Sequence, residues 1–171
     1  MLKRYFLAII LIYLQSIQAQ NLFVTGQEAD IILPYSPVSN ASALHMPGRI
    51  ACDSTHLYVA DIRNNRVLIW NSIPTTNNQP ADVVLGQPDF GSHDAGLGPS
   101  SLNWPYSVYS DGQHLFVADT YNHRVLIWNS IPTLNGQPAD IVLGQDDFYT
   151  VNPILGPTFI FEPWDVCFDG N

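Results

Sequence analysis

Apolar residues along this chain come in short runs of four or five, separated by stretches rich in Gly, Pro, Asn and Asp. Such strand signals fall at residues 106–110, 115–118, 125–128 and 140–143. The first run is followed by the turn pair Asp111-Gly112, and a tight connection, 119–123, joins the second run to the third. The pattern predicts four short antiparallel strands in one sheet.

The second and third of these strands are apolar at consecutive positions, rather than at alternate ones. Val117 and Ala118 are neighbours, and residues 125–128 read Val-Leu-Ile-Trp. A strand with one face in water alternates apolar and polar residues, whereas a strand buried on both faces does not. We therefore expect both faces of the sheet to be covered.

The whole pattern occurs twice. Residues 47–90 align without a gap on residues 105–148, a shift of 58, and 29 of the 44 aligned positions are identical. A third copy begins at Pro163, a further 58 residues along. A unit that recurs in this way is one supersecondary structure that buries its faces by stacking on its neighbours.

Four-stranded sheets stacked at a fixed period are typical of a β-propeller, so the expected fold is all-β, with antiparallel blades. The period of 58 exceeds the usual range of about 20–50 residues, and the excess lies in loops such as 71–80 and 86–103. Because a closed ring takes about 4–8 blades, the ring is expected to be incomplete here and the chain to be the N-terminal part of a longer one.

The predicted division of the chain follows from the repeat. Residues 26–33 resemble residues 136–143, so the N-terminal segment is expected to supply an outer fourth strand whose partners come from elsewhere. The predicted units are a signal peptide at 1–19, this N-terminal segment at 20–45, two repeats at 46–103 and 104–161, and the start of a third at 162–171.

The first residues have the features of a secretory signal. Lys3 and Arg4 precede an apolar run of ten residues, 5–14, and the small residue Ala19 offers a cleavage point. The run is too short to span a membrane, which takes about 20 apolar residues. We expect a secreted or periplasmic protein that is not inserted in a membrane after the signal is removed; the alternative is a buried N-terminal strand or helix.

Composition and charge narrow the class of partner. Hydrophobic residues make up 46% of the chain, enough for a packed core, and the 6 Lys and Arg face 15 Asp and Glu, a net charge of −9. Without the signal peptide, four Arg face the same 15 acids, and the net charge is −11. Nucleic acids and anionic membranes bind through clustered Lys and Arg, so both are disfavoured as partners.

The sequence Leu-Phe-Val-Ala-Asp-Thr-Tyr-Asn-His-Arg-Val at residues 115–125 resembles the NHL repeat, and residues 57–67 carry the same motif with Asn65 in place of His123. This resemblance implies a propeller, commonly one of six blades. The segment at 81–90 is similar to a variant found in exported bacterial proteins with NHL repeats, and the family alone fixes no activity.

Each copy of the motif holds an Asp, an Asn and an Arg at fixed spacing. The two sets are Asp61, Asn64 and Arg66, and Asp119, Asn122 and Arg124. Asp and Asn cap turns, and an Arg beside an Asp forms a bidentate pair, so a structural role is favoured. An Arg-lined mouth for an anionic ligand is the alternative.

Histidine and acidic residues offer no compact catalytic pattern. His56 and His114 hold equivalent turn positions and His123 lies in the motif, but their spacing matches no metal-binding template. Asp89 and the pair Asp146-Asp147 do not fit a calcium loop. We expect no catalytic residue, metal or cofactor in this region.

Cys52 and Cys167 fall in the first strands of repeats two apart. Sheets pack about 10 Å apart, whereas a disulfide needs Cα atoms within about 7 Å, so the two are not expected to pair. They are interpreted as small buried hydrophobic residues. The sequence Asn40-Ala41-Ser42 fits a glycosylation sequon.

Recognition is expected on the loops that follow the fourth strands. These loops share Gly-Gln-x-Asp-Phe at 86–90 and 144–148 and then diverge, as a fixed anchor with a variable tip would. The candidate binding residues at the tips are His93, Asp94, Tyr149 and Asn152. The predicted function is a scaffold that binds a protein, peptide or glycan; the alternative is an exported propeller enzyme, similar to NHL-type lyases or six-bladed lactonases, with a metal near the central channel.

Overall fold

The structure is a computed structural model that describes residues 29, 31–153 and 156–169. The predicted signal peptide at 1–19 lies outside the described residues, and so do residues 20–28 and 30 of the N-terminal segment. Helix among the described residues is limited to two 3₁₀ turns, η1 (Ile62–Asn64) and η2 (Thr120–Asn122). In that part of the chain no helix has the length and apolar character needed to cross a membrane.

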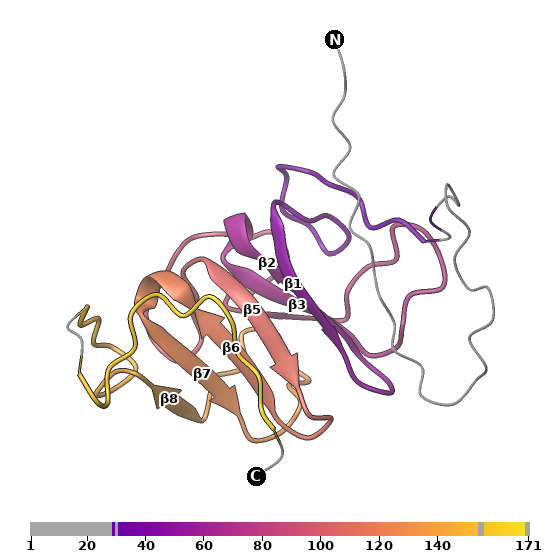
Figure 1. Ribbon diagram of the computed structural model, residues 1–171. Helices are drawn as coiled ribbons and strands as arrows, with labels where there is room; N and C mark the ends of the chain where they lie inside the picture. The colour runs from indigo at the N-terminus through magenta and orange to yellow at the C-terminus, as the bar shows by residue number, and fades with distance from the viewer. Residues whose placement is uncertain (1–28, 30, 154–155, 170–171) are drawn as a thin grey trace.

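The strands form two antiparallel sheets of four, each in chain order (Figure 1). The first sheet contains β1 (Pro47–Cys52), β2 (Leu57–Asp61), β3 (Arg66–Trp70) and β4 (Val83–Leu85). The second sheet contains β5 (Pro105–Ser110), β6 (Leu115–Asp119), β7 (Arg124–Trp128) and β8 (Ile141–Leu143). The prediction of four-stranded antiparallel sheets is confirmed, and the strand ends differ from the predicted ones by one residue at most.

The two sheets use the same strand register. Leu57 lies opposite Trp70 in the first sheet, as Leu115 lies opposite Trp128 in the second. Each first strand also has a register shift directly after its opening proline. Equal sequence at equal spacing therefore produces equal pairing, because the register is fixed by which apolar side chains must face each neighbouring layer.

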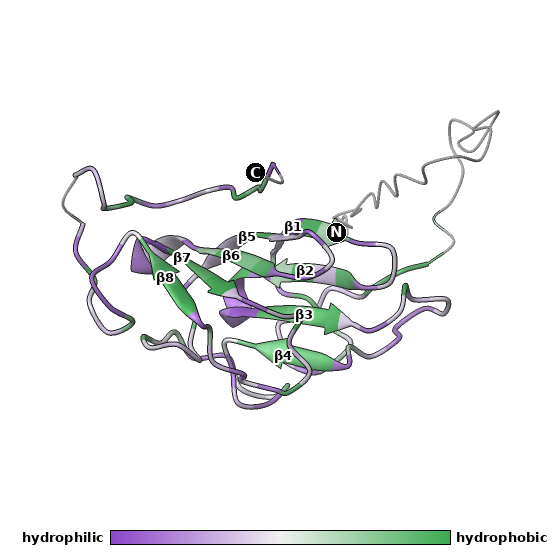
Figure 2. Cartoon of the chain, turned by 90° about the horizontal axis from the view of Figure 1, so that it is seen from below, coloured by the Kyte–Doolittle hydropathy of each residue, from purple (hydrophilic) through white to green (hydrophobic). Residues whose placement is uncertain are grey.

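The sheets pack face to face, with the first strands closest together (Figure 2). Figure 2 shows β1 beside β5, whereas β4 and β8 lie apart, so the two sheets spread like a fan. The layer between them is a continuous apolar core to which both sheets contribute. Its large side chains include Tyr58, Ile69, Leu85, Leu126 and Trp128.

The other face of the first sheet is covered by the segment that precedes it. Leu33 and Leu44 pack with Leu68 and Trp70 in a second apolar cluster. The backbone of Ile32 bonds to the β3–β4 loop: its N–H donates to Asn77 Oδ1 at 2.8 Å, and its C=O accepts from the N–H of Asn78 at 3.0 Å.

The same contact recurs one repeat later. The N–H of Val84, in β4, donates to Asn135 Oδ1 at 3.0 Å, and the C=O of Val84 accepts from the N–H of Gly136 at 2.9 Å. Ile32 therefore contacts the β3–β4 loop of the first sheet in the same way as Val84 contacts the β7–β8 loop of the second sheet.

The far face of the second sheet differs from the expectation. Val83 and Leu85 are 2% and 0% exposed in the first sheet, but the equivalent Ile141 and Leu143 are 41% and 48% exposed. Among the described residues, both faces of the first sheet are covered, whereas β8 is covered on one face only. The reason is that residues 156–169 cross this side without forming a sheet; they contact it through stacked rings such as Phe168 on Phe116, whose centroids are 5.6 Å apart.

The residue before the opening proline of each copy has an unusual backbone conformation. Met46, Trp104 and Glu162 each precede a proline and have φ values of 59°, 53° and 42°. Proline disfavours helical backbone before it, and a left-handed residue with a Cβ costs energy, so these positions must be held by their surroundings. The N–H of Trp104 donates to Asn65 Oδ1 at 2.9 Å, and that of Glu162 donates to His123 Nδ1 at 3.1 Å.

Candidate functional site

The repeated Asp, Asn and Arg side chains lie buried where β2 turns into β3. Nε of Arg66 donates to Asp61 Oδ2 at 2.8 Å, and both side chains are 0% exposed. Asn64 Nδ2 donates to the same oxygen at 2.8 Å, while Asp61 Oδ1 accepts from the N–H of His45 at 2.6 Å. The terminal nitrogens of Arg66 donate to the Ser39 hydroxyl and to three carbonyl oxygens, those of Asn40, Ala43 and Phe90.

The second copy reproduces this arrangement. Arg124 Nε donates to Asp119 Oδ2 at 2.7 Å, and Asn122 Nδ2 donates to that oxygen at 2.9 Å. Burial raises the pKa of Asp119 to about 6, against the opposing effects of the Arg124 charge and of three hydrogen bonds. Burial raises the pKa of Asp61 in the same way.

These buried arginines tie the loops before and after each sheet to the sheet itself. Arg124 donates to the carbonyl oxygens of Gly98 and Ser101, which precede β5, and of Phe148, which follows β8. Neither guanidinium is exposed. Their geometry fits the structural interpretation of the motif, and it leaves no guanidinium surface for an anionic ligand.

The predicted loop-tip residues occupy two neighbouring loops. His93 and Asp94 are exposed on the loop after β4, and Tyr149 is 70% exposed on the loop after β8. Asn152 is half-buried on that second loop. The Tyr149 ring lies against the first loop, since a Cβ added to Gly98 would be 3.3 Å from Tyr149 Cε1.

A buried glutamine anchors each tip. Gln87 Nε2 donates to the carbonyl oxygens of Asn65 and Asp94, at 2.9 and 2.8 Å. Gln145 Nε2 donates to those of His123 and Asn152, at 2.9 and 3.2 Å. The loop backbone is therefore fixed to the sheet, and the tip side chains project from it.

The histidines are held by their own turns. His56 Nδ1 lies 3.0 Å from Asp53 Oδ2, and His114 Nδ1 lies 2.8 Å from Asp111 Oδ2. Within the described ranges, no group of three or more His, Cys, Asp or Glu is placed to hold a metal ion.

The two cysteines are not bonded to each other. Cys52 is half-buried in β1, but Cys167 is exposed, so the interpretation of both as buried residues is wrong for Cys167. Cys167 stands on the segment after β8 that lies outside both sheets, where no second layer among the described residues covers it.

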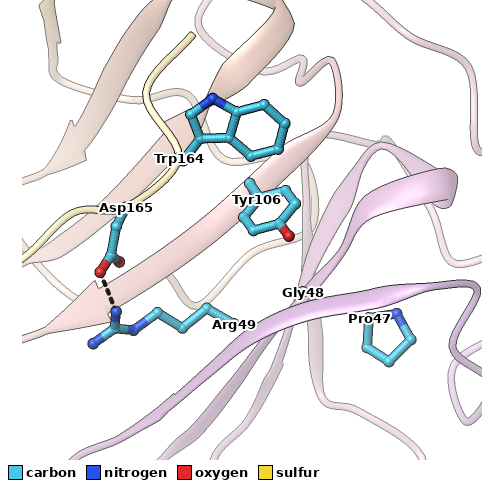
Figure 3. Close-up of a pocket in the computed structure, with 6 residues that line it drawn as sticks. All are labelled: Pro47, Gly48, Arg49, Tyr106, Trp164 and Asp165. Atoms are coloured by element: carbon cyan, nitrogen blue, oxygen red, sulfur yellow. Dashed lines mark hydrogen bonds and ion pairs between the residues drawn. The ribbon is translucent and has the colours of Figure 1, made fainter. Parts of the chain in front are cut away.

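A hollow that the sequence did not predict opens where the first strands begin (Figure 3). Its volume is about 470 Å³. Its lining consists of the starts of β1 and β5 and the equivalent residues of the third copy, namely Pro47, Gly48, Arg49, Tyr106, Trp164 and Asp165. In Figure 3 the Tyr106 ring lies between Trp164 and β1, and Arg49 extends toward Asp165.

A polar chain links three equivalent positions beside this hollow, Arg49, Ser107 and Asp165, which are spaced 58 residues apart. Arg49 Nη1 donates to Asp165 Oδ2, and the Ser107 hydroxyl donates to Asp165 Oδ1 at 2.7 Å. Burial raises the pKa of Asp165, but the bonds from Ser107 and the Val166 N–H and the Arg49 charge outweigh it, so the pKa lies below its usual value.

One sequence signal could have pointed to this hollow. Residues 48–52 and 106–110 form equivalent strands, yet none of the five aligned pairs is identical, although the repeats agree at 29 of 44 positions overall. A position at which the two copies differ while the backbone stays the same is a candidate for a role that belongs to one copy alone.

Comparisons with known proteins agree with the repeat. Residues 102–128 match the family model of the NHL repeat. NHL repeat-containing protein 2 of Bos taurus is 30% identical over 131 residues, which cover 74% of this chain and 17% of the bovine protein. The chain therefore corresponds to a small part of that relative's length. The matched residues include η2, β6 and the buried Asp, Asn and Arg of the second copy, and the chain is an NHL-repeat protein.

Proposed function

We propose that the two sheets are consecutive blades of a β-propeller and that the propeller is a scaffold that binds a macromolecular partner through its loops. The observation that supports a propeller is that the same contact between neighbouring layers occurs twice. Ile32 meets the first sheet through the same pair of backbone bonds by which Val84 meets the second. This equivalence supports the proposal that the N-terminal segment is the outer strand of a preceding blade.

The uncovered face of the second sheet supports a further blade. Ile141 and Leu143 repeat the positions of Val83 and Leu85, which the second sheet buries. Exposed apolar side chains in a strand stabilise the fold when another layer removes them from water, at about 25 cal/mol for each Å². The resemblance to the NHL family suggests six blades in all.

The loop tips support recognition of a protein, peptide or glycan. Each tip combines a backbone fixed by Gln87 or Gln145 with exposed polar and aromatic side chains, and Tyr149 is the most prominent. A rigid anchor lowers the entropy cost of binding, and tyrosine is enriched in recognition surfaces. The net charge of −9 disfavours nucleic acid. The basic and apolar first 19 residues support export to the periplasm or outside the cell.

The test is to replace the four tip residues, His93, Asp94, Tyr149 and Asn152, with Ser in the full chain. Peptides selected from a random library against the natural chain serve as the probe, and their Kd values are measured by interferometry. The variant should bind them at least about tenfold more weakly.

The matched control replaces Thr55 and Gln113 with Ser, because these residues lie in the turns that follow β1 and β5. Circular dichroism establishes that both variants fold. Equal affinity of the tip variant and the natural chain overturns the loop face as the binding surface.

A further inference from the structure

The hollow at the start of the first strands combines two aromatic rings with one ion pair. Trp164 and Tyr106 meet edge to face, with centroids 4.8 Å apart, and they are 54% and 36% exposed. Arg49 and Asp165 form the ion pair, and their side chains are 45% and 57% exposed. All four therefore offer surface to a ligand as well as to one another.

Each of these residues is peculiar to its own copy of the repeat. Arg49, Ser107 and Asp165 share one position, and Gly48, Tyr106 and Trp164 share the position before it. The identical residues of the two repeats lie mostly in the second to fourth strands and in the turns and loops that connect them, such as the buried Arg66 and Arg124. A site assembled from non-repeated side chains on a repeated backbone is what a scaffold carrying a specific ligand would have.

The charges in the hollow favour an uncharged ligand. A cation would lie beside Arg49 and an anion beside Asp165, while the chain as a whole is acidic. The guanidinium has five N–H donors and the carboxylate is an acceptor, so the pair provides both kinds of hydrogen-bonding group. The two aromatic rings lie at 73° to each other, and each provides its own apolar face next to the ion pair.

A sugar ring matches both features. It has hydroxyl groups that donate and accept, and it has an apolar face of C–H groups that can lie on an aromatic ring. The volume of about 470 Å³ falls in the range of about 300–1,000 Å³ that is usual for small-molecule sites. We propose that this hollow binds a neutral oligosaccharide, with Trp164 as the stacking surface and Arg49 and Asp165 bonding to hydroxyl groups.

The test measures binding of soluble oligosaccharides to the full chain. Cellotetraose, maltotetraose, laminaritetraose and chitotetraose are the neutral probes, a heparin tetrasaccharide is the anionic probe, and tetralysine is the cationic one. Saturation-transfer NMR detects binding, and titration calorimetry gives the Kd. At least one neutral probe should bind with a Kd below about 1 mM, and the two charged probes should bind more weakly.

Variants locate the site. Trp164→Ala and Arg49→Gln should each weaken binding of the neutral probe by at least about tenfold. Leu134→Ala is the matched control, an exposed apolar residue on the loop between β7 and β8 and outside both proposed surfaces, and it should leave the affinity unchanged. Both Trp164 and Arg49 are substantially exposed, so their variants are expected to fold, which circular dichroism checks.

Three results would overturn the proposal. One is that no neutral probe binds below about 1 mM. Another is that a charged probe binds more tightly than every neutral one. The third is that Trp164→Ala and Arg49→Gln bind the neutral probe as the natural chain does.

Discussion

The two sheets have nearly the same sequence in β2 to β4 and β6 to β8, and yet their surroundings differ. The first sheet lies between two apolar layers, one from the second sheet and one from residues 31–46. The second sheet has a neighbouring sheet on one side only, so Leu143 is 48% exposed where its equivalent Leu85 is 0% exposed. Burial in a repeat fold is therefore a property of the stack, since the local sequence is the same.

Substituting the buried tryptophans is the strongest test of the two layers. Trp70 packs against the N-terminal segment, and Trp128 packs between the sheets. Each donates its Nε1–H to a backbone carbonyl oxygen at 3.0 Å, that of Gln79 and that of Gln137 respectively. Trp70→Ala and Trp128→Ala should each lower the free energy of unfolding by about 3–5 kcal/mol. Urea titration followed by circular dichroism measures the change. A cost for Trp70→Ala below about 1 kcal/mol would mean that the N-terminal layer contributes little.

A matched leucine pair separates the two environments directly. Leu85→Ala removes a fully buried side chain and should cost about 2–5 kcal/mol. Leu143→Ala removes a half-exposed one and should cost below about 1 kcal/mol in the same titration. Equal costs would show that a further layer covers β8 in solution.

The residue at the left-handed turn of the motif differs between the copies, Asn65 in the first and His123 in the second. Both side chains accept the N–H of the residue before the opening proline of the next copy. His123→Ala leaves the N–H of Glu162 without this acceptor and should cost about 1–2 kcal/mol. His123→Asn should keep most of the stability, because Asn performs this role in the first copy. If His123→Asn is as unstable as His123→Ala, the two positions are not equivalent.

The smallest predicted effect depends on pH. Slight burial raises the pKa of Asp111, but the bonds from the His114 amide and ring and the Gln113 amide outweigh it, and the pKa is about 2 rather than 3.8. A lowered pKa in the folded state means that this stabilisation is present above about pH 4 and is lost as the pH falls through 2.

For an exposed group we expect the stabilisation by Asp111 to be below about 1 kcal/mol. Asp111→Asn should flatten the dependence of the unfolding free energy on pH between about pH 4 and pH 2. Burial raises the pKa of the equivalent Asp53, but bonds from the His56 and Thr55 amides, the Tyr58 hydroxyl and the His56 ring outweigh it, so Asp53→Asn should flatten the profile as well. An unchanged pH profile in Asp111→Asn would contradict the assignment.

Local structure was predictable because local sequence determines it. Consecutive apolar residues and the turn pair Asp111-Gly112 predicted the strands of the second sheet to within one residue. Exposure of Ile141 and of Cys167 was not predictable, since it depends on which layers surround them. The hollow was missed for a similar reason: Arg49 and Asp165 are 116 positions apart and meet only because the start of the third copy lies beside β1 and β5.

Gly48 allows the two sheets to approach each other closely. A Cβ at this position would lie 2.5 Å from the carbonyl oxygen of Tyr106, so only glycine lets β5 approach β1 as closely as it does. Each sheet presents one face to the layer before it and a different face to the layer after it. Repeating such a step yields either a closed ring or an open spiral, according to the rotation between successive layers. The missing side chain at residue 48 thus helps to determine the rotation between the first sheet and the second.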